Sequence, residues 1–325
     1  MSGEQKLPRW LFPILGATVL ASGLAAWIAS RPPADHSTPV QSSTPVSFAQ
    51  PGGSSARWTS VPLPVKAPLH AIADGVDVLY AVGDHGTVMR RHTAEDVWST
   101  VDSKTTANLR AVSVLGDRVV ATGDDGTVVA LDGKSAGFRP LASGTKVALR
   151  AVRLSAFGVV AAGDGGTIVR GAALDAEALA PEKSPTTEAL RGMCAAMTET
   201  WIVGDRGTLL RLTLMGVERV DSGTTENLRA VTCDGSKVIA VGDHGVVVQR
   251  ADPSAKFAVS HDGTADYLAI ASYYGNTTWV AVGRGAATSA TFADERTGLH
   301  GDLEGVVFST LGTWAVGTDG VFASR

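Results

Sequence analysis

The stretch AVGDHGTVMRR, residues 81–91, recurs with small changes along the chain and decides the fold. Four further copies follow it: ATGDDGTVVAL at 121–131, AAGDGGTIVRG at 161–171, IVGDRGTLLRL at 202–212 and AVGDHGVVVQR at 240–250. In each copy, branched residues flank a G-D-x-G turn, which is typical of two strands joined by a tight hairpin. Glycine reaches positive φ without steric cost, and aspartate can accept hydrogen bonds from nearby backbone amides. The chain therefore repeats one hairpin several times.

Two positions mark seven repeats of this unit. A leucine opens an L-R-A-V-like strand, with spacings of 40, 40, 41, 38, 40 and 35 residues between successive copies. A glycine closes the next strand, with spacings of 40, 40, 41, 38, 41 and 34 residues. The positions are Leu69, Leu109, Leu149, Leu190, Leu228, Leu268 and Leu303, and Gly83, Gly123, Gly163, Gly204, Gly242, Gly283 and Gly317. Repeats of this length with several short strands predict an all-β, seven-bladed β-propeller over residues 57–325.

Each repeat is expected to form four strands, as in residues 228–233, 237–242, 246–251 and 256–260. A large apolar residue stands 11 positions before each leucine and marks the outermost strand: Trp58, Trp98, Phe138, Leu179, Val217, Phe257 and Phe292. The last repeat ends after its third strand. We therefore expect residues 56–61 to complete the last blade, which also removes open sheet edges.

The first 30 residues differ from the rest of the chain. Residues 10–29 form a run of 20 without a charge, and a helix of that length spans about 30 Å, the thickness of a hydrocarbon core. Lys6 and Arg9 precede the run, which predicts a cytoplasmic N-terminus and an extracytoplasmic, periplasmic propeller. A signal peptide cleaved near residues 23–25 is the alternative to a membrane anchor over residues 1–30.

Residues 31–56 are rich in Pro, Ser, Thr and Gln. Such a composition buries too little apolar surface to fold, so these residues are expected to form a disordered linker. A flexible coil of this length has an end-to-end distance of ~28 Å.

Composition excludes several function classes. The chain has 28 Lys and Arg against 32 Asp and Glu, and a mildly acidic domain is a poor candidate for binding nucleic acid. Its seven histidines are scattered and no Cys-x-x-Cys occurs, so no metal site is expected. The turn aspartates come one to a repeat, and no glycine-rich phosphate loop precedes a helix. We therefore expect no catalytic residue and no cofactor, and a monomer that binds a protein partner.

Arginine follows the marker leucine in four consecutive repeats. In a propeller the first strand lines the central channel, and its start shares one rim with the turn after the second strand. The four side chains are thus expected to form a basic arc at one channel mouth, suited to carboxylates: Arg110, Arg150, Arg191 and Arg229. The alternative is internal pairing with the turn aspartates of the same repeats, Asp124, Asp164, Asp205 and Asp243. His70, Ala269 and Glu304 are assigned to this position in the other repeats.

The third residue of the G-D-x-G turn, which forms its tip, varies among the five copies, whereas the glycines and the aspartate are the same. Variable tips on a fixed frame are a common place for recognition, so His85, Arg206 and His244 join the candidate partner-binding rim, although ordinary solvated turns are an equal alternative.

The two cysteines fall in the first strands of adjacent repeats. Cys194 stands four residues after its leucine and Cys233 five, so their side chains point to opposite faces of their sheets. This parity favours two buried thiols over a disulfide.

Residues 224–250 resemble the repeat of the photosystem II stability/assembly factor family. That pattern is S-G-T, a spacer, L-x-x-V and then W-A-V-G-D-x-G-T followed by an apolar residue. It is also matched at residues 143–152, 222–231 and 313–317 and by Trp201. The last two repeats depart from it, because Arg284 and Thr318 stand where aspartate is expected.

The resemblance covers residues 57–325 and implies a propeller that assists a membrane-protein complex through binding, without catalysis. The competing class is a sialidase-like carbohydrate-active enzyme or glycan-binding propeller. Such an enzyme needs an arginine cluster, a tyrosine nucleophile and acidic partners. The turn box S-x-D-x-G-x-T-W of those enzymes is absent, which favours the binding scaffold.

Overall fold

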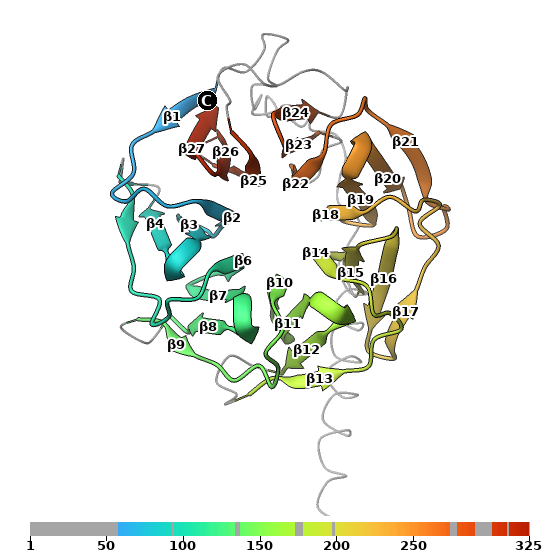
Figure 1. Cartoon of the computed structure of the whole chain (residues 1–325), viewed down its shortest axis with the longest axis horizontal. Helices are drawn as coiled ribbons and strands as arrows, with labels where there is room; N and C mark the ends of the chain where they lie inside the picture. Colours follow the sequence, from blue (N-terminus) through green and yellow to red (C-terminus); the bar gives the residue numbers. More distant parts are fainter. Residues whose placement is uncertain are drawn as a thin grey trace, which may run out of the picture. The chain divides into compact units, whose positions relative to one another are not determined.

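The computed structural model describes residues 58–324, apart from 93, 96, 134–136, 173–177, 197–198, 274–277, 290–300 and 311. These residues belong to one compact unit, Gly53–Arg325. They form seven antiparallel sheets arranged in a ring, which confirms the seven-bladed β-propeller (Figure 1). The expected anchor and linker lie outside the described residues. In the part that the structure describes, no helix is long and apolar enough to cross a membrane.

The strands of the first four blades follow one another in the chain. Blade 1 contains β2 (Leu69–Asp74), β3 (Val78–Gly83), β4 (Val88–His92) and β5 (Ser99–Thr100). Blade 2 contains β6 (Leu109–Leu115), β7 (Arg118–Gly123), β8 (Val128–Leu131) and β9 (Arg139–Pro140). Blade 3 contains β10 (Leu149–Ser155), β11 (Gly158–Gly163), β12 (Ile168–Gly171) and β13 (Ala180–Glu182). Blade 4 contains β14 (Leu190–Ala196), β15 (Glu199–Gly204), β16 (Thr208–Thr213) and β17 (Gly216–Arg219).

The last three blades complete the ring. Blade 5 contains β18 (Leu228–Asp234), β19 (Lys237–Gly242), β20 (Val246–Arg250) and β21 (Ala258–His261). Blade 6 contains β22 (Tyr267–Ser272), β23 (Trp279–Gly283) and β24 (Ala286–Ser289). Its expected outer strand around Phe292 lies outside the described residues. Blade 7 contains β25 (Leu303–Ser309), β26 (Gly312–Gly317), β27 (Gly320–Ser324) and the N-terminal strand β1 (Trp58–Val61).

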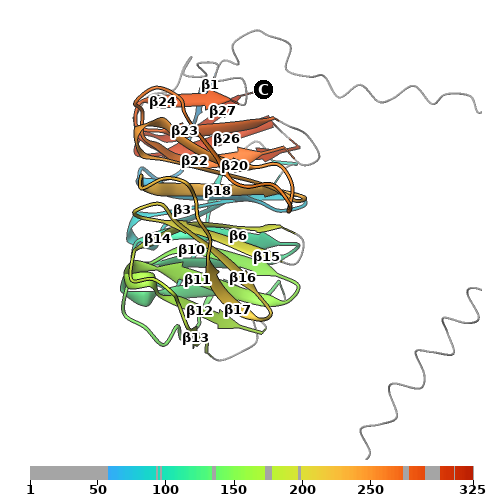
Figure 2. The same ribbon diagram turned by 90° about the vertical axis from the view of Figure 1, so that its right-hand side faces the viewer.

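The two faces of the disc carry different connections. One face, which we call the turn face, holds the short helical turns η2 (Asp84–Gly86), η3 (Asp124–Gly126), η4 (Asp164–Gly166) and η5 (Asp243–Gly245). The opposite face, the hairpin face, holds the loops from first to second and from third to fourth strands. Figure 2 shows the disc from its edge, with the strands running between these faces.

Steric contact explains why both glycines of the G-D-x-G turn recur. A Cβ at Gly123 would lie 2.0 Å from the carbonyl oxygen of Asn108, at the start of the first strand. Gly126 has φ +67°, and a Cβ there would lie 2.1 Å from the carbonyl oxygen of Thr145. Thr145 belongs to the S-G-T loop that leads to the next blade. The turn therefore packs on both its own blade and the following linker, and only glycine fits at either end.

The ends of the described chain meet in blade 7. Strand β1 pairs antiparallel with β27, with Trp58 opposite Ser324 and Val61 opposite Val321. Trp58 is buried in a cluster with Ala269 and Phe322. Blades 6 and 7 are thus packed together through a strand from the start of the propeller, and β27 has no free edge.

Blade 6 corrects one assignment from the sequence. Tyr267, and not Leu268, pairs with Gly283 and holds the place of the marker leucine. Leu268, and not Ala269, therefore occupies the position of the arc arginines. The two residues are apolar neighbours, so spacing alone could not decide which of them opens the strand. The hydroxyl of Tyr267 donates to Asp262 at 2.8 Å, which lets a buried tyrosine replace leucine.

Cys194 and Cys233 form a disulfide between blades 4 and 5, with Cα atoms 5.6 Å apart. The expectation of two buried thiols was wrong. The two side chains do have opposite parity, but opposite parity does not keep them apart. Where two blades pack together, one blade contributes one face of its sheet and its neighbour contributes the opposite face. Side chains of opposite parity therefore meet at the boundary between the blades.

Two other blade boundaries use the same positions. The backbone N–H of Leu154 donates to Oγ of Ser113 at 3.0 Å between blades 2 and 3. The hydroxyls of Thr232 and Ser272 lie 2.8 Å apart between blades 5 and 6. The disulfide is thus the covalent version of a contact that the ring makes elsewhere by hydrogen bonds.

Asp74, at the end of β2, gives the propeller a predicted dependence on pH. Burial raises the pKa of its carboxyl to about 6. Because the folded pKa lies above the unfolded value, this group destabilises the fold progressively as pH rises from about 4 to about 6. Replacing Asp74 by Asn should therefore raise stability at pH 7.5 by on the order of 1 kcal/mol, after allowance for its partial exposure.

Melting curves recorded from pH 4 to pH 8 check this prediction. The variant should melt about 2–4 °C above the parent at pH 7.5 and should converge with it near pH 4. Asp77, which is exposed in the same hairpin, provides the control change to Asn. A constant difference across the pH range would contradict the assignment to Asp74.

Candidate functional site at the channel mouth

A β-bulge positions each arginine of the predicted arc. In blade 2, Leu109 pairs with Gly123 and Ala111 with Thr122, so Arg110 is the extra residue of the inner strand. The same register shift occurs after Leu149, Leu190 and Leu228. A bulge changes the direction of its side chain. It turns these arginines toward the turn aspartates on the turn face.

Each arginine of the arc binds the aspartate of its own blade through two parallel hydrogen bonds. Nε donates to Oδ1 and Nη2 to Oδ2 in every case. The two distances are 3.0 and 2.8 Å for Arg110–Asp124, 2.6 and 2.8 Å for Arg150–Asp164, 2.9 and 2.7 Å for Arg191–Asp205, and 2.7 and 2.7 Å for Arg229–Asp243. The structure therefore contains the internal pairs that the shared presence of Arg and Asp suggested.

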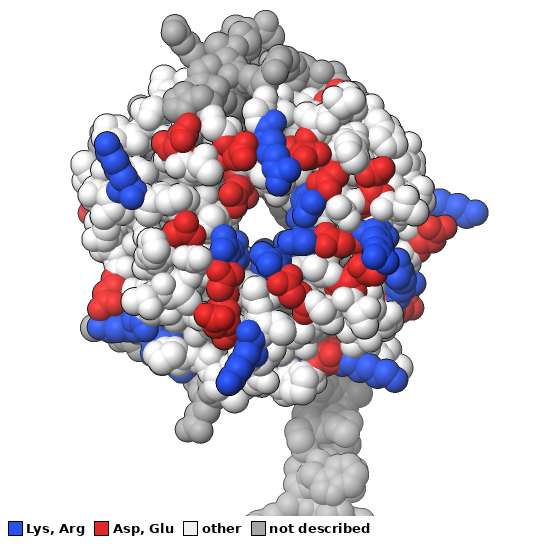
Figure 3. Space-filling model, in the orientation of Figure 1, with Lys and Arg blue, Asp and Glu red and all other residues white. Residues whose placement is uncertain are grey.

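Pairing leaves part of each guanidinium open. The arginine side chains of the arc are between 22% and 30% exposed. Nη1 of Arg110 lies 3.0 Å from His70, and Nη1 of Arg229 lies 3.8 Å from Asp205 of the preceding blade. For Arg150 and Arg191, Nη1 has no hydrogen-bond partner among the described residues. Figure 3 shows basic side chains along one side of the central opening, with acidic side chains beside them.

His70 extends the row of paired charges across the junction of blades 1 and 7. Its Nε2 lies 2.7 Å from Asp84, and its Nδ1 lies 2.7 Å from Glu304. Burial disfavours the charged imidazole, but the hydrogen bonds to Glu304 and Asp84 outweigh it and raise the pKa of His70. A protonated His70 therefore does in blade 1 what arginine does in blades 2 to 5.

Mutual pairing keeps the arc ionised. Hydrogen bonds from Arg110 and Arg150 lower the pKa values of Asp124 and Asp164. Burial would raise the pKa of Asp243, but Arg229 and Asn227 lower it overall. The stabilising effect of these carboxylates is present above their unfolded pKa values near 4 and is lost only as pH falls below that value.

An amide side chain links neighbouring blades next to the arc. Asn227 donates from Nδ2 to Asp243 at 2.8 Å, and its Oδ1 accepts from the backbone N–H of Arg206 at 3.0 Å. Asn108 makes the same two contacts, with Asp124 and with the backbone N–H of His85. In blades 2 and 5, the asparagine before the marker leucine thus ties the turn tip of the preceding blade to the aspartate of its own blade.

The predicted tip residues lie on the turn face in the left-handed backbone region. The φ angles are 55° for His85, 52° for Arg206 and 53° for His244. The side chains of Arg206 and His244 are 79% and 69% exposed. Arg206 approaches Glu188 at 3.4 Å, and Nδ1 of His244 lies 2.8 Å from Glu226. The tips therefore lie on the face that carries the arc, and these contacts do not involve its four arginines.

Sequence reasoning missed three parts of this site. It treats His70 and Glu304 only as departures from arginine, and it does not single out the linking asparagines. The signal for His70 is its place directly after Leu69, because imidazole can also bridge carboxylates there. In blade 6 the site is interrupted: Arg284, which replaces the turn aspartate, instead donates to Asp266 at 3.2 Å.

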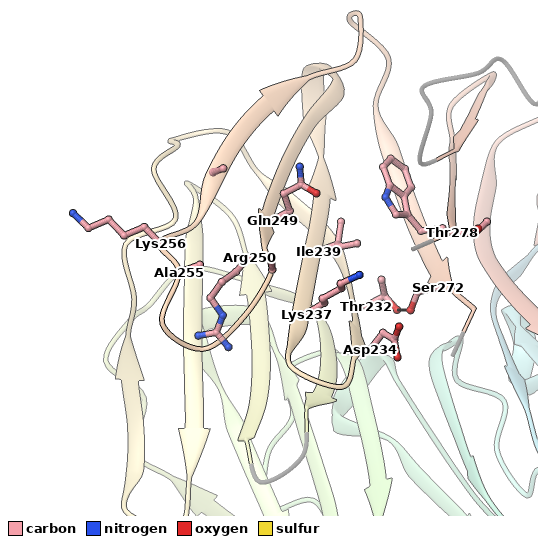
Figure 4. Close-up of a pocket in the computed structure, with 13 residues that line it drawn as sticks. Thr232, Asp234, Lys237, Ile239, Gln249, Arg250, Ala255, Lys256, Ser272 and Thr278 are labelled. Carbon is pink, nitrogen blue, oxygen red and sulfur yellow. Dashed lines mark hydrogen bonds between the residues drawn. The ribbon is translucent and has the colours of Figure 1, made fainter. Parts of the chain in front are cut away.

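A separate pocket of about 400 Å³ lies between blades 5 and 6 (Figure 4). Thr232, Asp234 and Ser272 lie near one another on one side, whereas Lys256 points away from the other labelled side chains. No arginine of the arc lines this pocket. Among the described residues, no group of three or more His, Cys, Asp or Glu is arranged to hold a metal ion.

Fold and site together define a seven-bladed β-propeller, closed by its N-terminal strand, with paired charges around one channel mouth. Neither protein-family models nor curated proteins match the sequence. Solved structures do match. One is the structure of YCF48 bound to D1 peptide, with a TM-score of 0.66 and 14% identity, covering 85% of this chain and 98% of that one.

Two further structures have the same architecture. YCF48 from Cyanidioschyzon merolae has a TM-score of 0.66 and 14% identity, and the match covers 83% of this chain and 98% of that one. The WD40 repeats of RRP9 have a TM-score of 0.69 and 8% identity, with 84% and 99% covered. At these identities the likeness establishes the fold alone.

Proposed function

We propose that this chain is a non-catalytic, membrane-anchored, extracytoplasmic propeller that binds another membrane or envelope protein and assists its assembly or stability. The observation that carries the proposal is the open Nη1 of Arg150 and Arg191, at a channel mouth on the face that also carries the variable turn tips. A charged donor held in place by its own aspartate is ready to bind a carboxylate without further ordering.

The structural likeness supports a peptide as the ligand. One propeller of the same architecture, YCF48, has been solved bound to D1 peptide. The resemblance of residues 224–250 to the assembly-factor repeat points the same way. We infer that a peptide side chain or C-terminus with a carboxylate contacts the arginine arc.

Two features support a location outside the cytoplasm. A disulfide such as Cys194–Cys233 forms and persists in oxidising compartments. The uncharged run at residues 10–29, with Lys6 and Arg9 before it, is the pattern of an anchor with a cytoplasmic N-terminus.

Pairing within the arc weighs against the carbohydrate-active alternative. A sialidase-like site uses several arginines to bind the carboxylate of its substrate. Here each arginine already donates two hydrogen bonds to an aspartate, so its bidentate edge is occupied. A role in binding a protein through the remaining edge is the better match to this geometry.

Crosslinking and pull-down from native membranes test the proposal. Changing Arg110, Arg150, Arg191 and Arg229 together to Gln should reduce partner recovery at least about tenfold, because a single lost charge-assisted hydrogen bond contributes ~1.5–3 kcal/mol. The control changes four arginines away from the channel mouth to Gln: Arg118, Arg170, Arg211 and Arg219. Equal recovery by both folded variants would exclude the arc as the binding surface.

A further inference from the structure

The hairpin face exposes large apolar side chains at the tips of its loops. Phe157, between β10 and β11, is 86% exposed. Leu214 and Met215, between β16 and β17, are 90% and 96% exposed. Loop tips on a soluble surface are usually small or polar, so these side chains indicate a surface that contacts something other than water.

Comparison among the blades shows that the hairpins do not need apolar tips. Blade 2 uses Gly116 and Asp117 at the place that Ala156 and Phe157 occupy in blade 3, and blade 5 uses Gly235 and Ser236. The turn closes equally well in all three blades. Phe157 is therefore not explained by the folding of its own blade.

The exposed apolar residues are unevenly distributed between the two faces. Val76, Val97 and Tyr273 also lie in loops of the hairpin face, and they are 74%, 66% and 45% exposed. Among the described residues, the one large apolar side chain exposed on the turn face is Val147, at 38%. The arginine arc and the apolar tips thus occupy opposite faces of the disc.

The chain enters the propeller at the hairpin face. Trp58 pairs with Ser324, and β27 runs from Gly320, next to the turn face, toward the hairpin face, so β1 begins at the hairpin face. Figure 2 marks the end of the chain beside β1 and β27. The part of the chain that precedes Trp58 therefore joins the propeller on the face that carries the apolar tips.

We propose that the hairpin face rests on the membrane surface, with Phe157, Leu214 and Met215 inserted at the lipid–water interface. This inference rests on the membrane anchor of the proposed function. Apolar side chains insert into the boundary between headgroups and acyl chains, and the anchor keeps the propeller close to the bilayer, where these tips can reach that boundary. The arginine arc then points away from the bilayer, where it is accessible to a partner.

Charge on the hairpin face is mixed and does not favour electrostatic adsorption. Asp77 and Asp117 are exposed beside the tips of blades 1 and 2, Arg118 follows Asp117, and Lys256 is exposed in the loop between β20 and β21. Because this face has no purely basic patch for anionic lipid, docking depends on the apolar tips and should occur on neutral lipid.

Photo-crosslinking of the full chain in vesicles of pure phosphatidylcholine tests the inference. A benzophenone amino acid is placed at position 157, at position 215 or, as the control on the opposite face, at position 147. Flotation first establishes that the chain is bound to the vesicles, and mass spectrometry then detects lipid adducts. We expect adduct yields at 157 and 215 several-fold higher than at 147.

The outcomes separate the two proposals. A chain that does not float overturns the anchor and the docking together. A chain that floats but gives no more adducts at 157 and 215 than at 147 overturns the docking and leaves the anchor standing. Adducts to a protein instead of lipid at 157 and 215 in native membranes would also overturn it.

A second variant tests the energetic role of the tips. Changing Phe157, Leu214 and Met215 together to Ser should lower the lipid adduct yield of a probe at position 76, on the same face, several-fold. The change Val147→Ser should leave that yield unchanged. Melting curves of both variants should match the parent, because the substituted side chains are exposed.

Discussion

Deletion of Trp58–Val61 is expected to be the most damaging small change in the propeller. It removes the outer strand of blade 7 and leaves β27 with an unpaired edge. It also removes Trp58 from its cluster with Ala269 and Phe322, and loss of a buried tryptophan alone costs ~3–5 kcal/mol. Because domains are stable by ~5–15 kcal/mol in total, the variant should be largely unfolded or aggregated.

Circular dichroism melting and size-exclusion chromatography measure this effect. Trp58→Ala should account for much of the loss of stability, whereas Ser60→Ala, at an exposed position of the same strand, should melt like the parent. A deletion variant that stays monomeric and melts at the parent temperature would show that blade 7 does not need β1.

Removal of the Cys194–Cys233 disulfide is expected to have the second largest effect. The bond closes a loop with a sequence separation of 39 residues, and loop-closure entropy alone corresponds to about 4 kcal/mol. Changing both cysteines to Ala should therefore lower the melting temperature by about 10 °C. The reason lies largely in the unfolded chain, which gains freedom when blades 4 and 5 are no longer tied.

A reducing agent provides the matched comparison. It should lower the melting temperature of the parent toward that of the double variant and should not affect the variant. Single changes of Cys194 or Cys233 to Ala should resemble the double variant, because either change removes the bond. If reductant shifts parent and variant equally, the disulfide does not contribute to stability.

Structure and sequence agree on the arginine arc, but only the structure defines its chemistry. The spacing after each leucine placed Arg110, Arg150, Arg191 and Arg229 on one rim. It could not decide between free and paired side chains. The bulge that directs each guanidinium, and the atoms that remain open on Arg150, depend on backbone register at the start of the inner strand.

The two proposals are complementary. The apolar tips lie on the hairpin face and the arginine arc on the turn face, so contact with a membrane at one face leaves the other face accessible to a protein partner. A propeller that lies on the bilayer and presents its arc outward is well placed to contact an exposed segment of a neighbouring membrane protein.

The sequence by itself determined the number of repeats, the order of the strands within a blade and the strand that closes the ring. These features follow from local rules: branched residues alternate in strands, glycine fits the turns, and a strand missing at one end must come from the other. Tertiary structure alone decided the Cys194–Cys233 bond, the replacement of Leu268 by Tyr267, and the bridging role of His70. Each depends on how neighbouring blades face one another, and periodicity along a single chain does not contain that information.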